Sequence, residues 1–88
     1  MSKISNQKKE KISEYILSFL FQSFPKPLFT SYIAKEVARD EEFVKKILLE
    51  LSSKKLIVPI YKNHKGIHYF RRIRWKLSNQ AYKVYTTR

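Results

Sequence analysis

The sequence predicts one mainly α domain that carries a β-hairpin, an α+β fold with the order helix, helix, helix, strand, strand, helix. Apolar residues recur at helical spacing through three segments of the first half. The second half alternates apolar and polar residues around Gly66, the one glycine of the chain, as hairpins do. With 88 residues and no cysteine, the chain has room for one thin core that no disulfide supports.

The first helix is expected over residues 8–24. Residues 1–7 lack an apolar period and are expected to form a flexible basic arm, which leaves residues 8–88 as the single domain. The face of this helix that suits the core consists of Ile12, Tyr15, Ile16, Phe19 and Ser23. A second apolar stripe consists of Leu17, Phe21 and Phe24. Either another helix of the chain or a second subunit must cover this stripe, and we favour a homodimer interface there.

A short second helix is expected after Pro25 and Pro27, because proline lacks the amide hydrogen that a continuing helix needs. Thr30 or Ser31 can cap its beginning through a side-chain oxygen. The buried side of this helix would consist of Ile33, Ala34 and Val37. The helix should then end in a turn near residues 38–40.

The third helix is expected over residues 41–53. Its core face would consist of Val44, Ile47, Leu48 and Leu51. Three carboxylates, those of Asp40, Glu41 and Glu42, stand at its beginning, where negative charge stabilises the positive end of the helix dipole. Leu49 lies among the polar residues of the opposite side, where it could contact a thymine methyl group, pack under the first helix or stay exposed.

The hairpin is expected from an apolar strand at residues 56–61, a turn at 62–66 and a second strand up to residue 77. The inward face of the second strand would carry Ile67, Tyr69, Ile73, Trp75 and Leu77, and the outward face His68, Phe70, Arg72, Arg74 and Lys76. Ser78 can then cap a final short helix. That helix would return Ala81, Tyr82 and Tyr85 to the core.

The charge is unevenly distributed along the chain. Nineteen Lys and Arg residues outnumber seven Asp and Glu, for a net charge of +12, and every acidic residue precedes Leu51. Folding does not require such an asymmetry, and repulsion between like charges opposes compaction. The asymmetry therefore indicates an anionic partner, with a merely lysine-rich solvated surface as the alternative.

Several classes of function lack support in the sequence. The longest apolar stretch, residues 15–21, is far shorter than the roughly 20 residues of a membrane-spanning helix. His64 and His68 have no evident third metal ligand. The sequence has no glycine-rich phosphate loop and no carboxylate near either histidine. We therefore expect no catalysis, metal, cofactor, small-molecule substrate or membrane association.

Four segments resemble the winged helix-turn-helix family of DNA-binding proteins, particularly its small archaeal and viral regulators. Residues 30–37 resemble the first helix of the motif, 41–51 its recognition helix, 54–57 the entry to the wing, and 75–78 the exit from it. The resemblance implies that the recognition helix enters the major groove of double-stranded DNA. It also implies that the hairpin contacts the neighbouring backbone or minor groove.

By position, the resemblance implies eight DNA-binding residues: Lys45 and Lys46 on the recognition helix, and Lys62, His64, Lys65, Arg71, Arg72 and Arg74 on the wing. The sequence departs from the family pattern at two places. Lys55 replaces the usual glycine before the wing, so that the recognition helix is expected to end in another way. The carboxylates at residues 40–42 would also repel nearby phosphates.

The leading hypothesis is a sequence-specific, double-stranded DNA-binding transcriptional regulator, a homodimer located in the cytoplasm and associated with the nucleoid. One alternative is an architectural DNA- or RNA-binding winged-helix protein, which would use the same positive charge without reading a sequence. The other is a protein-interaction module, in which the acidic start of the third helix and the apolar first helix contact a partner. A preference for one DNA sequence would separate the first hypothesis from both alternatives.

Overall fold

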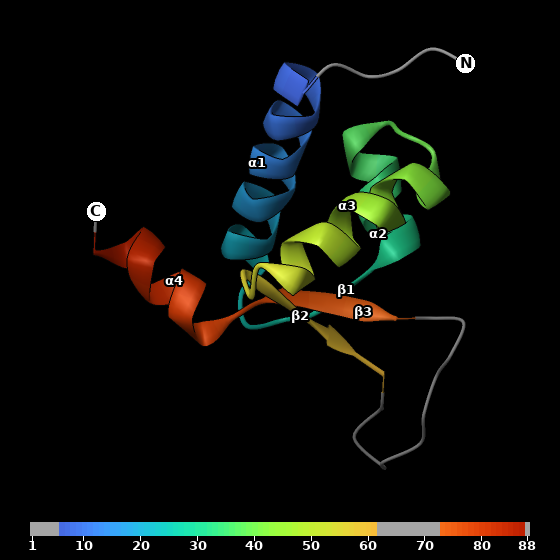
Figure 1. Cartoon of the computed structure of the whole chain (residues 1–88). Coiled ribbons are helices and arrows are strands. Elements are labelled where there is room, and N and C mark those ends of the chain that lie inside the picture. The colour runs from blue at the N-terminus through green and yellow to red at the C-terminus, as the bar shows by residue number, and fades with distance from the viewer. Residues whose placement is uncertain (1–5, 62–72, 88) are drawn as a thin grey trace.

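A computed structural model, which describes residues 6–61 and 73–87, shows four helices and a small antiparallel sheet (Figure 1). The elements in chain order are α1 (Asn6–Ser23), β1 (Leu28–Phe29), α2 (Thr30–Val37), α3 (Glu41–Ser53), β2 (Ile57–Ile60), β3 (Arg74–Leu77) and α4 (Asn79–Thr86). The expected α+β fold is confirmed. Helix α1 begins two residues earlier than expected. No helix within the described ranges is long and apolar enough to cross a membrane.

The sheet has the strand order β1-β3-β2, and β3 therefore lies in its centre. Strand β2 pairs with β3 over its whole length, as the hairpin prediction requires. Strand β1 was not predicted, because two residues are too few to show an alternating pattern. It pairs Leu28 with Trp75 and Phe29 with Arg74. This pairing joins the beginning of α2 to the strand that leaves the wing.

The core face of α3 is the one that the sequence predicts: Val44, Ile47 and Leu48 are fully buried and Leu51 nearly so. Trp75 and Leu77 are also fully buried, which confirms the expected alternation over the described part of the second strand. Residues 67–72 of that strand lie outside the described residues. Ile33 and Ala34 of α2 complete this side of the core as expected, with Val37 half-buried beside them.

The prediction that Thr30 or Ser31 caps α2 is wrong. Phe29 holds the cap position, and no side chain there accepts a hydrogen bond from the helix. The hydroxyl of Thr30 is instead buried, where its Oγ1 accepts a 2.7 Å hydrogen bond from Nε1 of Trp75. A buried indole N–H needs such a partner. Thr30 therefore serves the core rather than the end of the helix.

Replacing Thr30 by valine, which has nearly the same shape, is expected to leave the Trp75 N–H buried without a partner. The free energy of unfolding should fall by about 1–3 kcal/mol, measured by urea denaturation. Thr87→Val, at the exposed end of α4, should change it by less than about 0.5 kcal/mol. The double variant Thr30→Val/Trp75→Phe should lose less unfolding free energy than the sum of the losses in the two single variants. Strictly additive losses would contradict the role assigned to this hydrogen bond.

Helices α2 and α3 both end at a left-handed residue that is not glycine. Ala38 has a φ of 57° and Lys55 a φ of 63°. After α3, the Lys55 N–H donates to the Ser52 carbonyl at 2.9 Å and the Leu56 N–H to the Leu51 carbonyl at 3.0 Å. These are the two hydrogen bonds of a Schellman motif, which glycine normally completes. The expectation that α3 ends in another way is therefore wrong, because Lys55 adopts the glycine conformation.

Lys55→Gly is expected to stabilise the protein, because a side chain with a Cβ pays about 1–2 kcal/mol for the left-handed conformation. A net gain of about 1 kcal/mol would raise the melting temperature by about 4–8 °C in a domain of this size. The matched control is Lys54→Gly, since Lys54 has a φ of −84° and gains nothing from glycine. Equal melting temperatures for the two variants would contradict the prediction.

Helix α4 begins as predicted, with the Ala81 N–H donating to Oγ of Ser78 at 3.1 Å. It returns Ala81 to the core, and Tyr82 and Tyr85 pack on the core half-buried. Within α1, however, Tyr15 is 52% exposed, whereas Leu20, which neither predicted stripe included, is fully buried. The inward face of α1 is therefore rotated from the expected one, toward α4.

The second stripe of α1 is covered by α4 of the same chain. Leu17 is only 8% exposed. The ring of Phe21 lies 5.3 Å from the rings of both Tyr82 and Tyr85, and the ring of Phe24 stacks on Tyr82 at 4.1 Å. The premise that Leu17, Phe21 and Phe24 need a second subunit is therefore wrong, because the chain's own tyrosines contact both phenylalanines and Leu17 belongs to the core.

Candidate nucleic-acid interface

The outward side of α3 carries both charge signs. Lys45 and Lys46 are exposed, and so are Glu41 and Glu42 in the first turn. The carboxylate of Asp40 accepts hydrogen bonds from the backbone N–H groups of residues 42 and 43, at 3.1 and 3.3 Å. Because a capping carboxylate compensates the positive end of the helix, Asp40 opposes a phosphate less than its formal charge suggests.

A further carboxylate of α3 is engaged by a lysine of α1. Oε1 of Glu50 lies 2.5 Å from Nζ of Lys9, in an ion pair that joins the C-terminal half of α3 to the beginning of α1. Both side chains are more than one third exposed, so the pair adds at most about 1 kcal/mol to stability. Its effect on the surface is to compensate the negative charge of Glu50 near the exposed lysines of α3.

At the base of the wing, β3 directs two cations to the side of the sheet opposite Trp75. The Arg74 guanidinium lies 5.9 Å from the centre of the Phe29 ring, and Nζ of Lys76 lies 5.7 Å from the centre of the Phe24 ring. Contacts of this kind are worth about 0.5–1 kcal/mol at exposed sites. The rings therefore hold both cations against the outer face of the sheet.

Of the eight residues that the resemblance implies for DNA binding, the structure places Lys45, Lys46 and Arg74. The other five, Lys62, His64, Lys65, Arg71 and Arg72, lie outside the described residues. Arg74 lines a groove of about 480 Å³ together with Lys26, Pro27, Leu28, Phe29 and Tyr32. Neither Lys45 nor Lys46 lines this groove. The structure thus places basic residues both on α3 and in a groove at the root of the wing.

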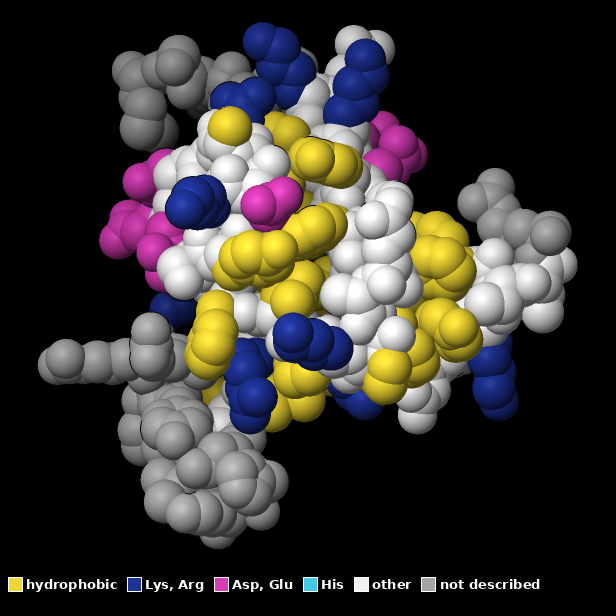
Figure 2. Space-filling view, turned by 180° about the vertical axis from the view of Figure 1, so that it is seen from behind, with side chains coloured by type: hydrophobic (Ala, Val, Ile, Leu, Met, Phe, Trp, Pro, Cys, Tyr) yellow, Lys and Arg dark blue, Asp and Glu magenta, His cyan; other side chains and the backbone are white. Residues whose placement is uncertain are grey.

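The groove at the root of the wing was not predicted from the sequence. Its aromatic members, Phe29 and Tyr32, are 38% and 46% exposed. Figure 2 shows one face of the molecule, on which hydrophobic side chains gather and Lys and Arg side chains lie among them at the lower end. No signal in the sequence could have located it, because Phe29 is an extended residue before α2 and the groove also needs Arg74 from β3.

A metal centre finds no support in the described ranges, 6–61 and 73–87, where no three His, Asp or Glu side chains gather into a possible site. His64 and His68 lie outside these ranges. The described surface thus offers lysines, an arginine and aromatic rings, which bind anions and stack on planar groups.

Solved structures that resemble this chain include a transcription regulator, MepR. Staphylococcus aureus MepR in its DNA-binding conformation is 25% identical, with a TM-score of 0.70 over 93% of this chain and 61% of that one. The S. aureus MepR–DNA complex is 24% identical, with a TM-score of 0.70 over 93% and 69%. A variant of Lactococcus lactis ZitR is 21% identical, with a TM-score of 0.70 over 92% and 56%.

Comparison with protein-family models and with curated proteins gives no match. The chain spans just over half the length of two of these solved chains, 53% of one MepR variant and 56% of the ZitR variant. These likenesses establish the fold as a winged helix-turn-helix, in which α2 and α3 form the helix-turn-helix and β2 and β3 belong to the wing. MepR is described as a transcription regulator of the multidrug efflux pump MepA.

Proposed function

We propose that this protein is a sequence-specific, double-stranded DNA-binding transcriptional regulator without catalytic activity. The observation that carries the proposal is the exposure of Lys45 and Lys46 on the second helix of a helix-turn-helix, in the fold that MepR uses in a complex with DNA. Helix α3 would enter the major groove, while the wing would contact the neighbouring backbone or minor groove. A DNA partner also accounts for the excess of 12 positive charges.

Base discrimination would come from the exposed side of α3. Leu49 is 49% exposed, so it does not pack under α1 and is available to contact a thymine methyl group. Phosphates would repel the Glu42 carboxylate, but a cytosine amino group can donate a hydrogen bond to it. Lys45 and Lys46 can contact guanine or phosphates. Lys62, His64, Lys65, Arg71, Arg72 and Arg74 would supply most of the phosphate contacts, and hence most of the affinity.

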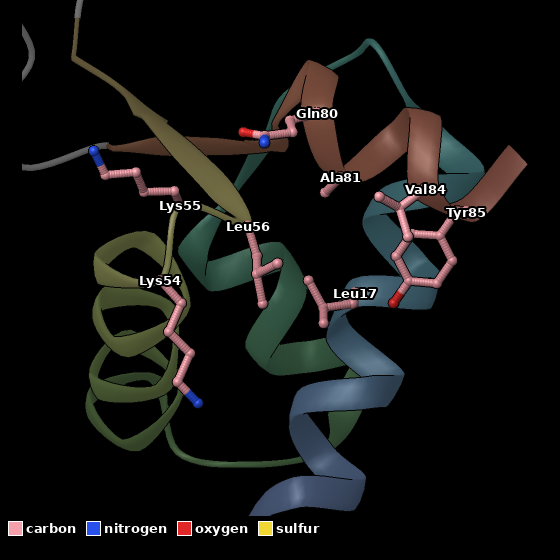
Figure 3. Close-up of a pocket in the computed structure, with 8 residues that line it drawn as sticks. All are labelled: Leu17, Lys54, Lys55, Leu56, Gln80, Ala81, Val84 and Tyr85. Carbon is pink, nitrogen blue, oxygen red and sulfur yellow. The ribbon is translucent and has the colours of Figure 1, made fainter. Parts of the chain in front are cut away.

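A homodimer remains part of the proposal, since two copies read two half-sites, but its interface would lie beside the stripe on α1 and share only Leu17 with it. The surface left for pairing is a groove of about 620 Å³ between α1, α4 and the turn before β2, where Leu17, Leu56 and Ala81 point toward one another and Lys54 and Lys55 also line the groove (Figure 3). Val84 at its edge is 60% exposed. Sedimentation of Val84→Glu tests this interface, because the variant should stay folded and sediment as a monomer.

The proposal includes the cellular location of the protein. A regulator of this kind would act in the cytoplasm, in association with the nucleoid. The likeness to small archaeal and viral regulators rests on the sequence segments alone. An architectural DNA- or RNA-binding role is the second candidate, favoured by basic residues on both α3 and the groove at the root of the wing. It differs in one measurable respect, the absence of sequence preference.

Selection of bound fragments from random DNA, followed by footprinting, tests the proposed function. The selected site should bind about 10³-fold or more tightly than competitor DNA. Lys45→Ala with Lys46→Ala and Leu49→Ala should reduce this preference, because each removes a candidate base contact. Lys83→Ala, which removes an exposed lysine of α4, is the matched control and should leave it unchanged. Uniform affinity for all duplexes would favour the architectural role.

A further inference from the structure

We propose that the groove lined by Lys26, Pro27, Phe29, Tyr32 and Arg74 binds unpaired bases of a single nucleic-acid strand. The inference rests on the proposed nucleic-acid-binding function but uses a surface that neither Lys45 nor Lys46 lines. Its volume of about 480 Å³ lies within the ~300–1,000 Å³ range of ligand sites. The ligand class follows from the two kinds of side chain that meet there, aromatic and cationic.

The aromatic rings of the groove are both accessible and held in place. Tyr32 is 46% exposed, and its ring packs against that of Phe19 at 5.7 Å. Phe29 is 38% exposed, and its ring lies under the guanidinium of Arg74. Rings that the protein already holds lose little conformational freedom when a base stacks on them. A base paired within a duplex does not offer its flat face, whereas an unpaired base does.

The charges of the groove favour a phosphate backbone. Lys26 and Arg74 lie on either side of the aromatic residues in the sequence and line the same groove, and the described residues that line it include no carboxylate. Arg74 also belongs to β3, the strand that leaves the wing. A single strand in the groove would therefore continue from DNA held by the wing, as at a locally opened duplex.

Stacking distinguishes this occupant from an acidic protein segment. Carboxylates would complement the charges of Lys26 and Arg74 but would make no use of two exposed rings, and a purely apolar segment would make no use of the two positive charges. Bases joined by phosphates satisfy both kinds of side chain at once. The planarity of the ring at position 32, rather than its hydrophobicity or its hydroxyl, is thus the property to test.

The experiment measures binding of the full-length protein to a fluorescent single-stranded oligonucleotide of mixed sequence, by anisotropy, with the corresponding duplex in parallel. Tyr32→Phe keeps the ring and should bind the single strand as the wild type does. Tyr32→Leu keeps apolar bulk without a flat ring and should weaken that binding on the order of tenfold, with duplex affinity nearly unchanged. Tyr15→Leu removes an exposed tyrosine that does not line the groove and should behave as the wild type does. Circular dichroism checks that all variants are folded.

Where the wild type binds the single strand, two results would overturn the inference. One is equal single-strand affinity for Tyr32→Leu and Tyr32→Phe. The other is displacement of the oligonucleotide by polyglutamate at the same charge concentration, which would show that the groove selects charge alone and suits an acidic segment. If the wild type binds the duplex but not the single strand, the inference fails and the proposed function stands. If it binds neither, both fail.

Discussion

Leu17→Glu is expected to leave most of the protein unfolded. Leu17 is 8% exposed and belongs to the core between α1 and α4. Truncation of a buried leucine to alanine costs about 2–5 kcal/mol, and a buried unpaired carboxylate costs more. A domain of this size has a total stability of only about 5–15 kcal/mol. Far-UV circular dichroism and urea denaturation should therefore show little folded protein.

Leu49→Glu is the matched control, since the same substitution is made at a leucine that is 49% exposed on α3. Its stability should stay within about 0.5 kcal/mol of the wild type. Leu17→Ala is a milder second variant. Its loss of unfolding free energy should lie near the lower end of the range for buried leucine-to-alanine changes, because the adjoining groove allows neighbouring side chains to relax. A Leu17→Glu protein that stays folded and sediments as a monomer would restore the stripe as a subunit interface.

Binding to duplex DNA should weaken steeply with salt. If six to eight basic groups contact phosphates, the slope of log affinity against log salt is about −5 to −7. Raising the salt from ~50 to ~200 mM would then reduce affinity about 10³- to 10⁴-fold. Anisotropy titrations at several salt concentrations measure the slope. A flat response would remove nucleic acid as the main partner.

Single variants locate the residues that produce this slope. Arg74→Ala should reduce its magnitude by about 1, if Arg74 contacts one phosphate, and should weaken all sequences alike. The fold should survive, because Arg74 lies on the side of β3 opposite the buried Trp75. Lys83→Ala removes the same charge from α4 and should leave the slope unchanged. Equal slopes for Arg74→Ala and the wild type would place the phosphate contacts elsewhere.

The parts of the fold that follow from local pattern were predictable. Helix α3 is regular and amphipathic, so its period identifies all four buried residues, and Ser78 stands directly before its helix. The features that sequence reasoning missed depend on residues far apart in the chain. Thr30 is drawn into the core by an indole 45 positions later, and the two residues of β1 form a strand only because β3 lies beside them.

The candidate site likewise has a part that follows from local pattern and a part that depends on residues far apart in the chain. Exposure of Lys45 and Lys46 follows from the helical period of α3, which buries their neighbours Val44 and Ile47. The groove of Phe29 and Tyr32 could not be located, because it needs Arg74 from the distant strand β3. Lys55 shows the limit of reasoning from residue preference. Its left-handed conformation is unfavourable locally, yet the hydrogen bonds and packing around the helix end hold it there.

The cover that α4 provides for α1 has a consequence for synthesis of the chain. Phe21 leaves the ribosome well before Tyr82 and Tyr85, the residues that contact its ring. Throughout that interval the nascent chain displays an aromatic helix face, the kind of surface that chaperones bind and that promotes aggregation. Premature termination before α4 would leave the face uncovered and mark the product for proteolysis. Helix α4 thereby distinguishes chains that contain it from fragments that end before it.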